Sequence, residues 1–177
     1  VHGIRKYVGV LDTPDGAKLL TNIGEARRKG ADLAGAQEAY VAARQIRELT
    51  NTLETEDGAS LLTNIGDLKS DNGDVQGALE ALETAKRIHS SGGTLRTPDG
   101  AMCLTSLGVA RLHGGNVAGA LEAYEAAWWT CKQTVTLDLP EGKILVARMR
   151  DTPEGAALLD KIDAMAKRTA QESLLST

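Results

Sequence analysis

Cysteine and histidine, the side chains best suited to metal binding or nucleophilic chemistry, are few in this sequence and widely separated. Cys103 and Cys131 lack metal-ligand spacing and are too few for a disulfide framework. They fall near opposite ends of two expected antiparallel helices and could approach each other, but we expect free, partly buried thiols. His2, His89 and His113 stand in different segments without grouped ligands, and we expect surface or interface residues. The sequence therefore predicts no metal site.

The glycine-rich stretch Ser91-Gly92-Gly93-Thr94 is a second candidate for chemistry, as a phosphate-binding loop. It lacks the GxxxxGK[ST] and GxGxxG orders and is not set between a strand and a helix, so we interpret it as a loop. No Ser/His/Asp or Cys/His arrangement can be singled out, and the acidic residues fall where helix caps and solvated faces need them. We therefore expect a protein that is not an enzyme and binds no cofactor.

The composition favours packed helices. Of the 177 residues 42% are hydrophobic, but only 3% are aromatic and none is Phe, so small residues with Leu and Ile must form the core. The formal charge of −4 is spread without a basic block, which argues against nucleic-acid binding. No apolar run approaches the roughly 18 residues of a membrane span. The chain opens on Val1 without a leader, so we expect a processed or truncated start and a soluble, intracellular protein, cytoplasmic or organellar after removal of a leader.

A five-residue motif returns along the sequence with a period of 42 residues, beginning at Thr13, Thr55 and Thr97. Apolar positions inside the units repeat with the same period, which chance cannot plausibly produce. The period predicts repeats at 13–54, 55–96 and 97–138. Residues 1–12 read as the tail of a preceding partial repeat, and 139–177 as an irregular fourth unit with a C-terminal capping helix from Pro153 to about Leu175.

Each unit reads as two amphipathic helices, because apolar residues recur every three or four positions in 17–24 and again in 33–46. The Thr-Pro-Asp start supplies a cap, a residue without an N–H, and a charge that suits the helix dipole. Turns rich in Gly and Asn or Asp separate the two helices. Small residues on the first helix should leave room for a neighbouring backbone, with large partners on the second helix: Gly24, Gly66 and Gly108, with Tyr40, Leu82 and Tyr124.

The Leu-x-x-Ile/Leu-Gly of the first helix and the Ala-x-x-x-Tyr/Leu-x-x-Ala of the second resemble a tetratricopeptide repeat. The 42-residue period, Leu-Thr-Asn-Ile and Ile-Arg-Glu are similar to the kinesin light chain variety, over about Ile4 to Gly142. The resemblance implies an all-α, right-handed superhelical solenoid of antiparallel helix hairpins. Two features depart from the family: Arg27, Lys69 and Arg111 replace a large aromatic residue, and Thr21 and Glu25 replace a Lys and Asn carboxylate clamp. A chaperone-tail clamp is therefore disfavoured.

The resemblance also implies a non-catalytic scaffold whose first helices line a groove that binds a protein or an extended peptide. Polar side chains there can bond to a peptide backbone, while Glu25 and Asp67 would favour a basic ligand. As an alternative, Asn22 and Asn64 bond to the adjacent hairpin and hold the stack together. The nominated partner-binding residues are Lys18, Thr21, Asn22, Glu25, Thr63, Asn64, Asp67, Thr105 and Ser106.

Trp128 and Trp129 stand where the earlier repeats carry Arg44-Gln45 and Lys86-Arg87. Two indoles at these positions must be buried either under the irregular fourth unit or in a partner. The second alternative is supported by the enrichment of exposed Trp at interface hot spots. They are therefore nominated for partner binding too. The second reading of the function is a fixed structural subunit, docked on a large multiprotein complex, organellar or not, through this C-terminal part.

Overall fold

The computed structural model describes residues 12–134, 136–138 and 140–175, with side chains up to residue 164 except those of 140 and 141. This part of the chain is all-helical, with eight helices and no strand. The expected partial repeat at 1–12 lies, except for Asp12, outside the described residues. The helices are α3 (Pro14–Lys29), α4 (Leu33–Leu49), α5 (Glu56–Asp71), α6 (Val75–Ser91), α7 (Pro98–His113), α8 (Val117–Gln133), α9 (Pro140–Arg150) and α10 (Pro153–Leu175).

Side-chain caps begin each helix of the three regular units, as the sequence predicted. Thr13 accepts a hydrogen bond from the Gly16 N–H at 3.1 Å, and the cap recurs at Thr55 and Thr97. Asp32, Asp74 and Asn116 cap the second helix of each unit in the same way. Because these contacts are local, the period of the sequence becomes a period of helix starts.

The turn between the two helices of a unit needs one residue in the left-handed region. The second and third units place glycine there, with φ of 78° at Gly73 and 77° at Gly115. The first unit has Ala31 at φ 63° instead. A side chain costs about 1 kcal/mol in this conformation, so the first turn is the strained one.

The glycines of the first helices receive a side chain rather than a neighbouring backbone, which corrects the sequence expectation. A Cβ at Gly24 would collide with the Tyr40 ring, and one at Gly66 would lie 2.5 Å from Leu82 Cγ. Gly108 meets Tyr124 in the same way. The large residue on the second helix therefore packs onto the glycine of its own unit and holds the pair together.

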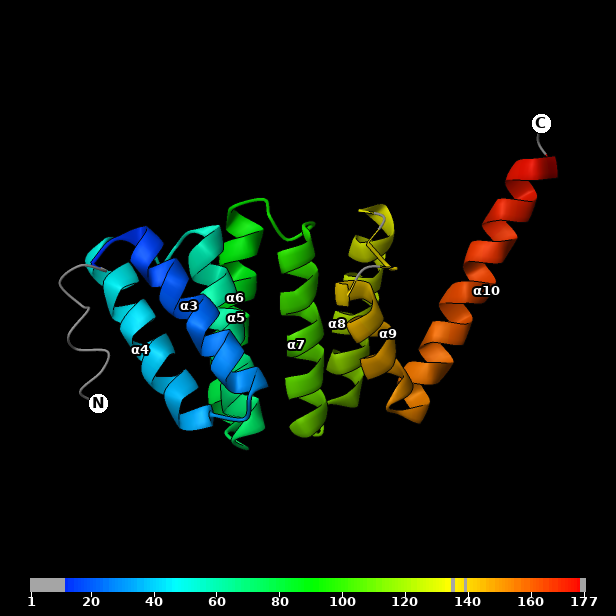
Figure 1. Cartoon of the computed structure of the whole chain (residues 1–177). Coiled ribbons are helices and arrows are strands. Elements are labelled where there is room, and N and C mark those ends of the chain that lie inside the picture. Colours follow the sequence, from blue (N-terminus) through cyan, green and yellow to red (C-terminus); the bar gives the residue numbers. More distant parts are fainter. Residues whose placement is uncertain (1–11, 135, 139, 176–177) are drawn as a thin grey trace.

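The helix pairs stand in a row, with the described ends of the chain at opposite sides (Figure 1). We call α3, α5, α7 and α9 the first helices, and α4, α6 and α8 the second helices. Each first helix contacts the next first helix, and each second helix packs between its own first helix and that of the following unit. Neighbour contacts of this kind supply the stability of a repeat array.

The fourth unit keeps the register and then breaks it. Leu145 and Met149 are fully buried on α9, one period after the buried Cys103 and Leu107. The helix ends at Arg150, and α10 leaves the row at an angle (Figure 1). Among the described residues, no helix is both long enough and apolar enough to cross a lipid bilayer.

Candidate functional site

The first helices line two adjoining hollows. One, of about 310 Å³, lies between α3, α5 and α7, with Arg47 of α4 at its wall. The other, of about 330 Å³, extends along α3, α5 and α7 to α9. Glu25, Asn64 and Met102 line both hollows, so together they form one surface, which we call the groove.

All nine side chains nominated on the first helices lie along the groove. The first hollow is lined by Lys18, Thr21, Asn22, Glu25, Thr63 and Asn64. The second is lined by Asp67, Thr105 and Ser106, together with Glu25 and Asn64. The fold therefore brings the nominated residues to one face, although the side chains differ in what they can offer a ligand.

The three threonines are turned onto their own helices. The Thr21 hydroxyl donates to the Ala17 carbonyl at 2.8 Å, and Thr63 and Thr105 donate to the corresponding carbonyls at 3.0 and 2.8 Å. Each threonine is buried. Their hydroxyl protons are therefore occupied within the helix, a common arrangement for a mid-helix threonine.

The Asn22 and Asn64 amides, unlike the threonine hydroxyls, make no hydrogen bond to their own helices in the described part of the chain. Asn22 is exposed and Asn64 is half-buried in the groove. Within the described part of the chain, neither side chain hydrogen-bonds to the neighbouring hairpin, so the stack-holding alternative has no contact to support it there. Each amide carries two donors and an acceptor, a set that matches an extended backbone.

The acidic groups proposed to attract a basic ligand have cationic partners within the chain. Lys29 Nζ lies 2.6 Å from Glu25 Oε1. Arg28 of α3 reaches across to α5, at 3.4 Å from Asp67 and 2.7 Å from Asp71. Burial raises the pKa of the Asp67 carboxyl, while hydrogen bonding from Ser106 and the charge of Arg28 oppose the rise.

Arg28 was not singled out from the sequence, and the reason is visible in the repeat. Its counterparts one and two periods later are Ser70 and Leu112, so the period gave it no weight. Ser70 makes an analogous contact across the next boundary, at 3.0 Å from His113 Nδ1. Arg28 and Ser70 thus both join successive first helices from the same position of the repeat.

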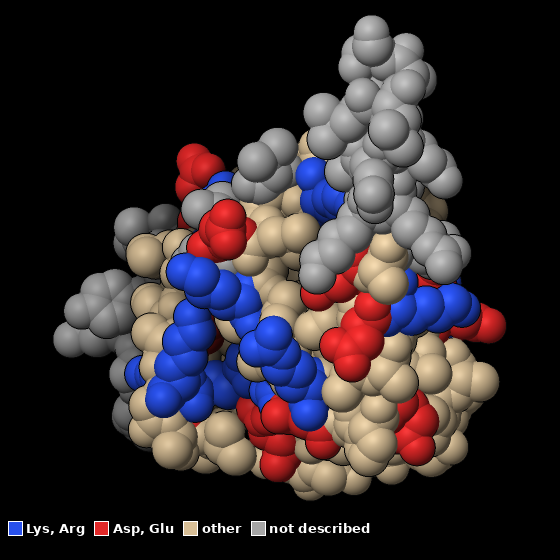
Figure 2. All heavy atoms as spheres, turned by 90° about the vertical axis from the view of Figure 1, so that its right-hand side faces the viewer, with Lys and Arg blue, Asp and Glu red and all other residues tan. Residues whose placement is uncertain are grey.

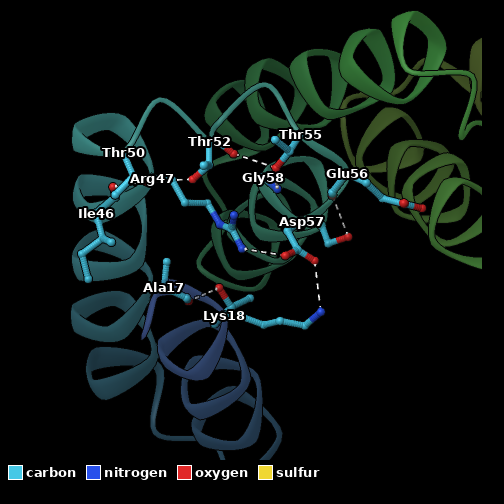
Figure 3. Close-up of polar contacts among 12 residues, drawn as sticks. Ala17, Lys18, Ile46, Arg47, Thr50, Thr52, Thr55, Glu56, Asp57 and Gly58 are labelled. Atoms are coloured by element: carbon cyan, nitrogen blue, oxygen red, sulfur yellow. Dashed lines mark hydrogen bonds and ion pairs between the residues drawn. The ribbon is translucent and has the colours of Figure 1, made fainter. Parts of the chain in front are cut away.

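Arg47 is the second groove residue that sequence reasoning missed. It is only 1% exposed, although it carries a charge. Its guanidinium lies 3.4 Å from Asp57, which also lies 3.3 Å from Lys18 (Figure 3). In the described part of the chain Arg47 Nε has no hydrogen-bond partner. Burying a cation that lacks a full set of partners costs free energy.

The Arg47 position is buried in every regular unit, occupied next by His89 and then by Cys131. His89 Nδ1 lies 2.8 Å from the Thr94 hydroxyl, and its Nε2 has no partner among the described residues. Burial lowers the pKa of His89, against the opposing charges of Asp99 and Glu56. This histidine is thus held neutral at the boundary between the second and third pairs, while His113 is exposed and His2 lies outside the described residues.

Neither described cysteine forms a disulfide, and both thiols are fully buried rather than partly buried as expected. Cys103 Sγ lies 3.7 Å from the Leu82 carbonyl. Burial raises the pKa of Cys103 to about 11, so the thiol stays protonated and unreactive at neutral pH. Among the described residues, no three His, Cys, Asp or Glu side chains gather as metal ligands.

The structure separates the two tryptophans. Trp128 is 4% exposed and packs with Leu145, Met149 and Leu159 beneath α9 and α10. Trp129 remains 39% exposed, with its ring edge-on to Trp128 at 5.0 Å. Lys132 Nζ lies over both rings. Trp128 thus has little surface to offer a partner, whereas Trp129 has a substantial one.

Charges of both signs occur together on the surface. Viewed from the C-terminal end, Lys and Arg side chains gather on one side with Asp and Glu next to them (Figure 2). This mixture of signs on the visible face matches the ion pairs found along the groove.

Comparison with known proteins adds no family assignment. No protein-family model matches the chain, and no curated protein sequence matches it. The function of the chain must therefore be inferred from the groove and its chemistry.

Proposed function

We propose that this chain is a non-catalytic scaffold that binds an extended segment of another protein in the groove. In this proposal the helix pairs form a right-handed tetratricopeptide-like solenoid, and the first helices present the ligand surface. Asn22 and Asn64 bond to the backbone of the segment, and the hollows accept its side chains. The buried threonines shape the surface without donating to the ligand.

The observation that carries this proposal is the pair of amides in the groove. Neither has a partner in the described part of the chain, and they stand one period apart on adjacent first helices. A purely structural array would gain by using such amides between hairpins, because a hydrogen bond contributes about 1 kcal/mol. Amide donors and acceptors that have no partner in a hollow can hydrogen-bond to a ligand that carries its own donors and acceptors.

Site-specific photo-crosslinking tests the proposal. A benzophenone side chain is placed at Asn22, and as a matched control at Gln45, an exposed amide on the second helix α4. We expect the Asn22 probe to crosslink one defined segment of a partner, identified by mass spectrometry. A synthetic copy of that segment should bind the full chain, and Asn64→Ala should weaken binding about fivefold, the loss of one hydrogen bond.

Two results would count against groove binding: crosslinks of equal yield and identity from both probes, or a segment whose affinity is unchanged by Asn64→Ala and by Asn22→Ala. Folding of each variant is checked by circular dichroism, so that lost binding cannot be mistaken for unfolding.

A fixed subunit that docks through the C-terminal part is the second candidate, favoured by the exposed Trp129. A hollow of about 400 Å³ beside Trp128, Leu137 and Val146 adds a surface between α8, α9 and α10. Placing the same probe at Trp129 distinguishes the two candidates. Docking at this end predicts an abundant crosslink from Trp129 and none from Asn22.

A further inference from the structure

The groove changes from charged to apolar along its length. At one position of the first helices the four units carry Lys18, Ser60, Met102 and Ile144. Met102, Ile144 and Val109 all line the second hollow, and Ile144 is 43% exposed. These three residues, which we call the aliphatic seat, expose apolar surface to solvent on the same surface as the two free amides.

The charges of the groove are largely balanced within the chain. Five cationic and five acidic side chains line the two hollows. Lys18 and Arg47 share Asp57, Lys29 pairs with Glu25, and Arg28 pairs with Asp67 and Asp71. Asp99 lies 3.4 Å from the Ser60 hydroxyl.

Arg148 pairs with Asp151, so in the described part of the chain a charged ligand side chain would have to share or displace an existing ion pair at each of these groups except Asp99, whose contact is the Ser60 hydroxyl. The new ion pair would replace an old one, so its net gain is small, and a partly exposed pair changes an affinity by at most about fivefold. Covering the aliphatic seat displaces no partner. Burying one Leu-sized side chain raises an affinity by roughly ten- to hundredfold. Apolar burial is thus the larger source of selectivity in this groove.

We propose that the groove selects an extended peptide segment with an aliphatic side chain that rests on Met102, Val109 and Ile144, flanked by uncharged polar residues. This inference rests on the proposed function and names the chemistry of its ligand. Asn64 lines both hollows, so its amide can bond to the peptide backbone next to the seat. Charged residues in the segment contribute little to selection.

Selection from a random peptide library displayed on phage tests this chemistry with the full chain as bait. We expect the selected peptides to share one position enriched in Leu, Ile, Met or Val, with no enrichment of acidic or basic residues. The double variant Met102→Ser/Ile144→Ser places serine at these two positions of the seat, as the second unit already does at Ser60. It should weaken a selected peptide about tenfold or more.

Val117→Ser is the matched control, because Val117 is 38% exposed on α8, away from the residues that line the groove. It should leave the affinity unchanged. Peptides that bind through Asn22 and Asn64 but carry only charged residues would overturn the aliphatic seat and leave groove binding intact. Peptides insensitive to both the amide and the seat variants, or a library that yields no binders, would overturn groove binding as well.

Discussion

The guanidinium of Arg47 lies 3.4 Å from the carboxylate of Asp57, joining the end of the first helix pair to the start of the second. Asp57 also binds Lys18 at 3.3 Å, so one carboxylate holds two cations at the wall of the groove. Arg47 is almost fully buried, whereas the Asp57 side chain is 45% exposed. Asp57 therefore takes part both in the packing between the two units and in the candidate binding surface.

Removing the acid should cost more than removing the cation. Asp57→Asn leaves the buried Arg47 guanidinium without its counter-charge, and we expect the free energy of unfolding to fall by about 2 kcal/mol, after allowing for the exposure of Asp57. Arg47→Met replaces the guanidinium, with its unpartnered Nε, by an apolar chain of similar length. It should change the free energy by about 1 kcal/mol or less.

Urea unfolding followed by circular dichroism measures both variants. Arg44→Met is the control, because Arg44 is half exposed in a pair with Glu48, and its loss should cost under about 0.5 kcal/mol. A larger loss for Arg47→Met than for Asp57→Asn would show that the cation stabilises the fold by more than its burial costs.

His89 should make stability depend on pH. Burial lowers its pKa from the ordinary value near 6.5, so as the pH falls through about 6.5 the unfolded chain takes up the proton first. Stability that depends on the neutral form is complete above that pH and is lost as the pH falls towards the lower pKa of the folded state. His89→Gln should therefore reduce the loss of unfolding free energy between about pH 7.5 and about pH 5.5.

Asp99→Asn should lower the pKa of His89 further, because the charge of Asp99 favours the imidazolium. A His89 ring that titrates in NMR at or above pH 6.5, the ordinary value, contradicts this prediction.

The two tryptophans should differ in their effects on stability. Trp128→Ala removes a ring from the core beneath α9 and α10 and should cost about 3 to 5 kcal/mol. Trp129→Ala loses one edge-on ring contact and one exposed Lys132 contact, and should cost about 1 kcal/mol. Hydrogen exchange should show α9 and α10 opening in the Trp128 variant alone. Equal protection of these helices in both variants would mean that Trp128 does not hold the C-terminal end.

Much of the fold could be predicted from the sequence because its determinants are local. Thr13 accepts a hydrogen bond from the N–H three residues further on, and Gly24 faces Tyr40 within one unit, so the 42-residue period repeats the same contacts. The irregular end was harder to predict. The sequence placed the start of a capping helix at Pro153, but the direction of α10 depends on the buried cluster that Leu159 and Ile162 form with Trp128.

The candidate site could be predicted as a set of positions but not as chemistry. Thr21 stands on the groove, yet its hydroxyl bonds to its own helix, a choice of rotamer that spacing does not encode. The pair of Arg28 with Asp71 joins residues 43 positions apart on different helices. Arg28 also pairs with Asp67, and without knowledge of that ion pair the sequence shows Asp67 only as an unpaired acid. Neutralisation of the groove from within becomes visible only when the helices are placed side by side.

Chemical-shift mapping of the full chain with a library-selected peptide tests most directly whether the first helices form the binding surface. Groove binding predicts the largest amide and side-chain shifts on α3, α5 and α7, at Asn22, Asn64 and Ser106. The methyl signals of Met102 and Ile144 should shift as well. Shifts confined to the second helices α4, α6 and α8, or to Trp129 and α10, would contradict it.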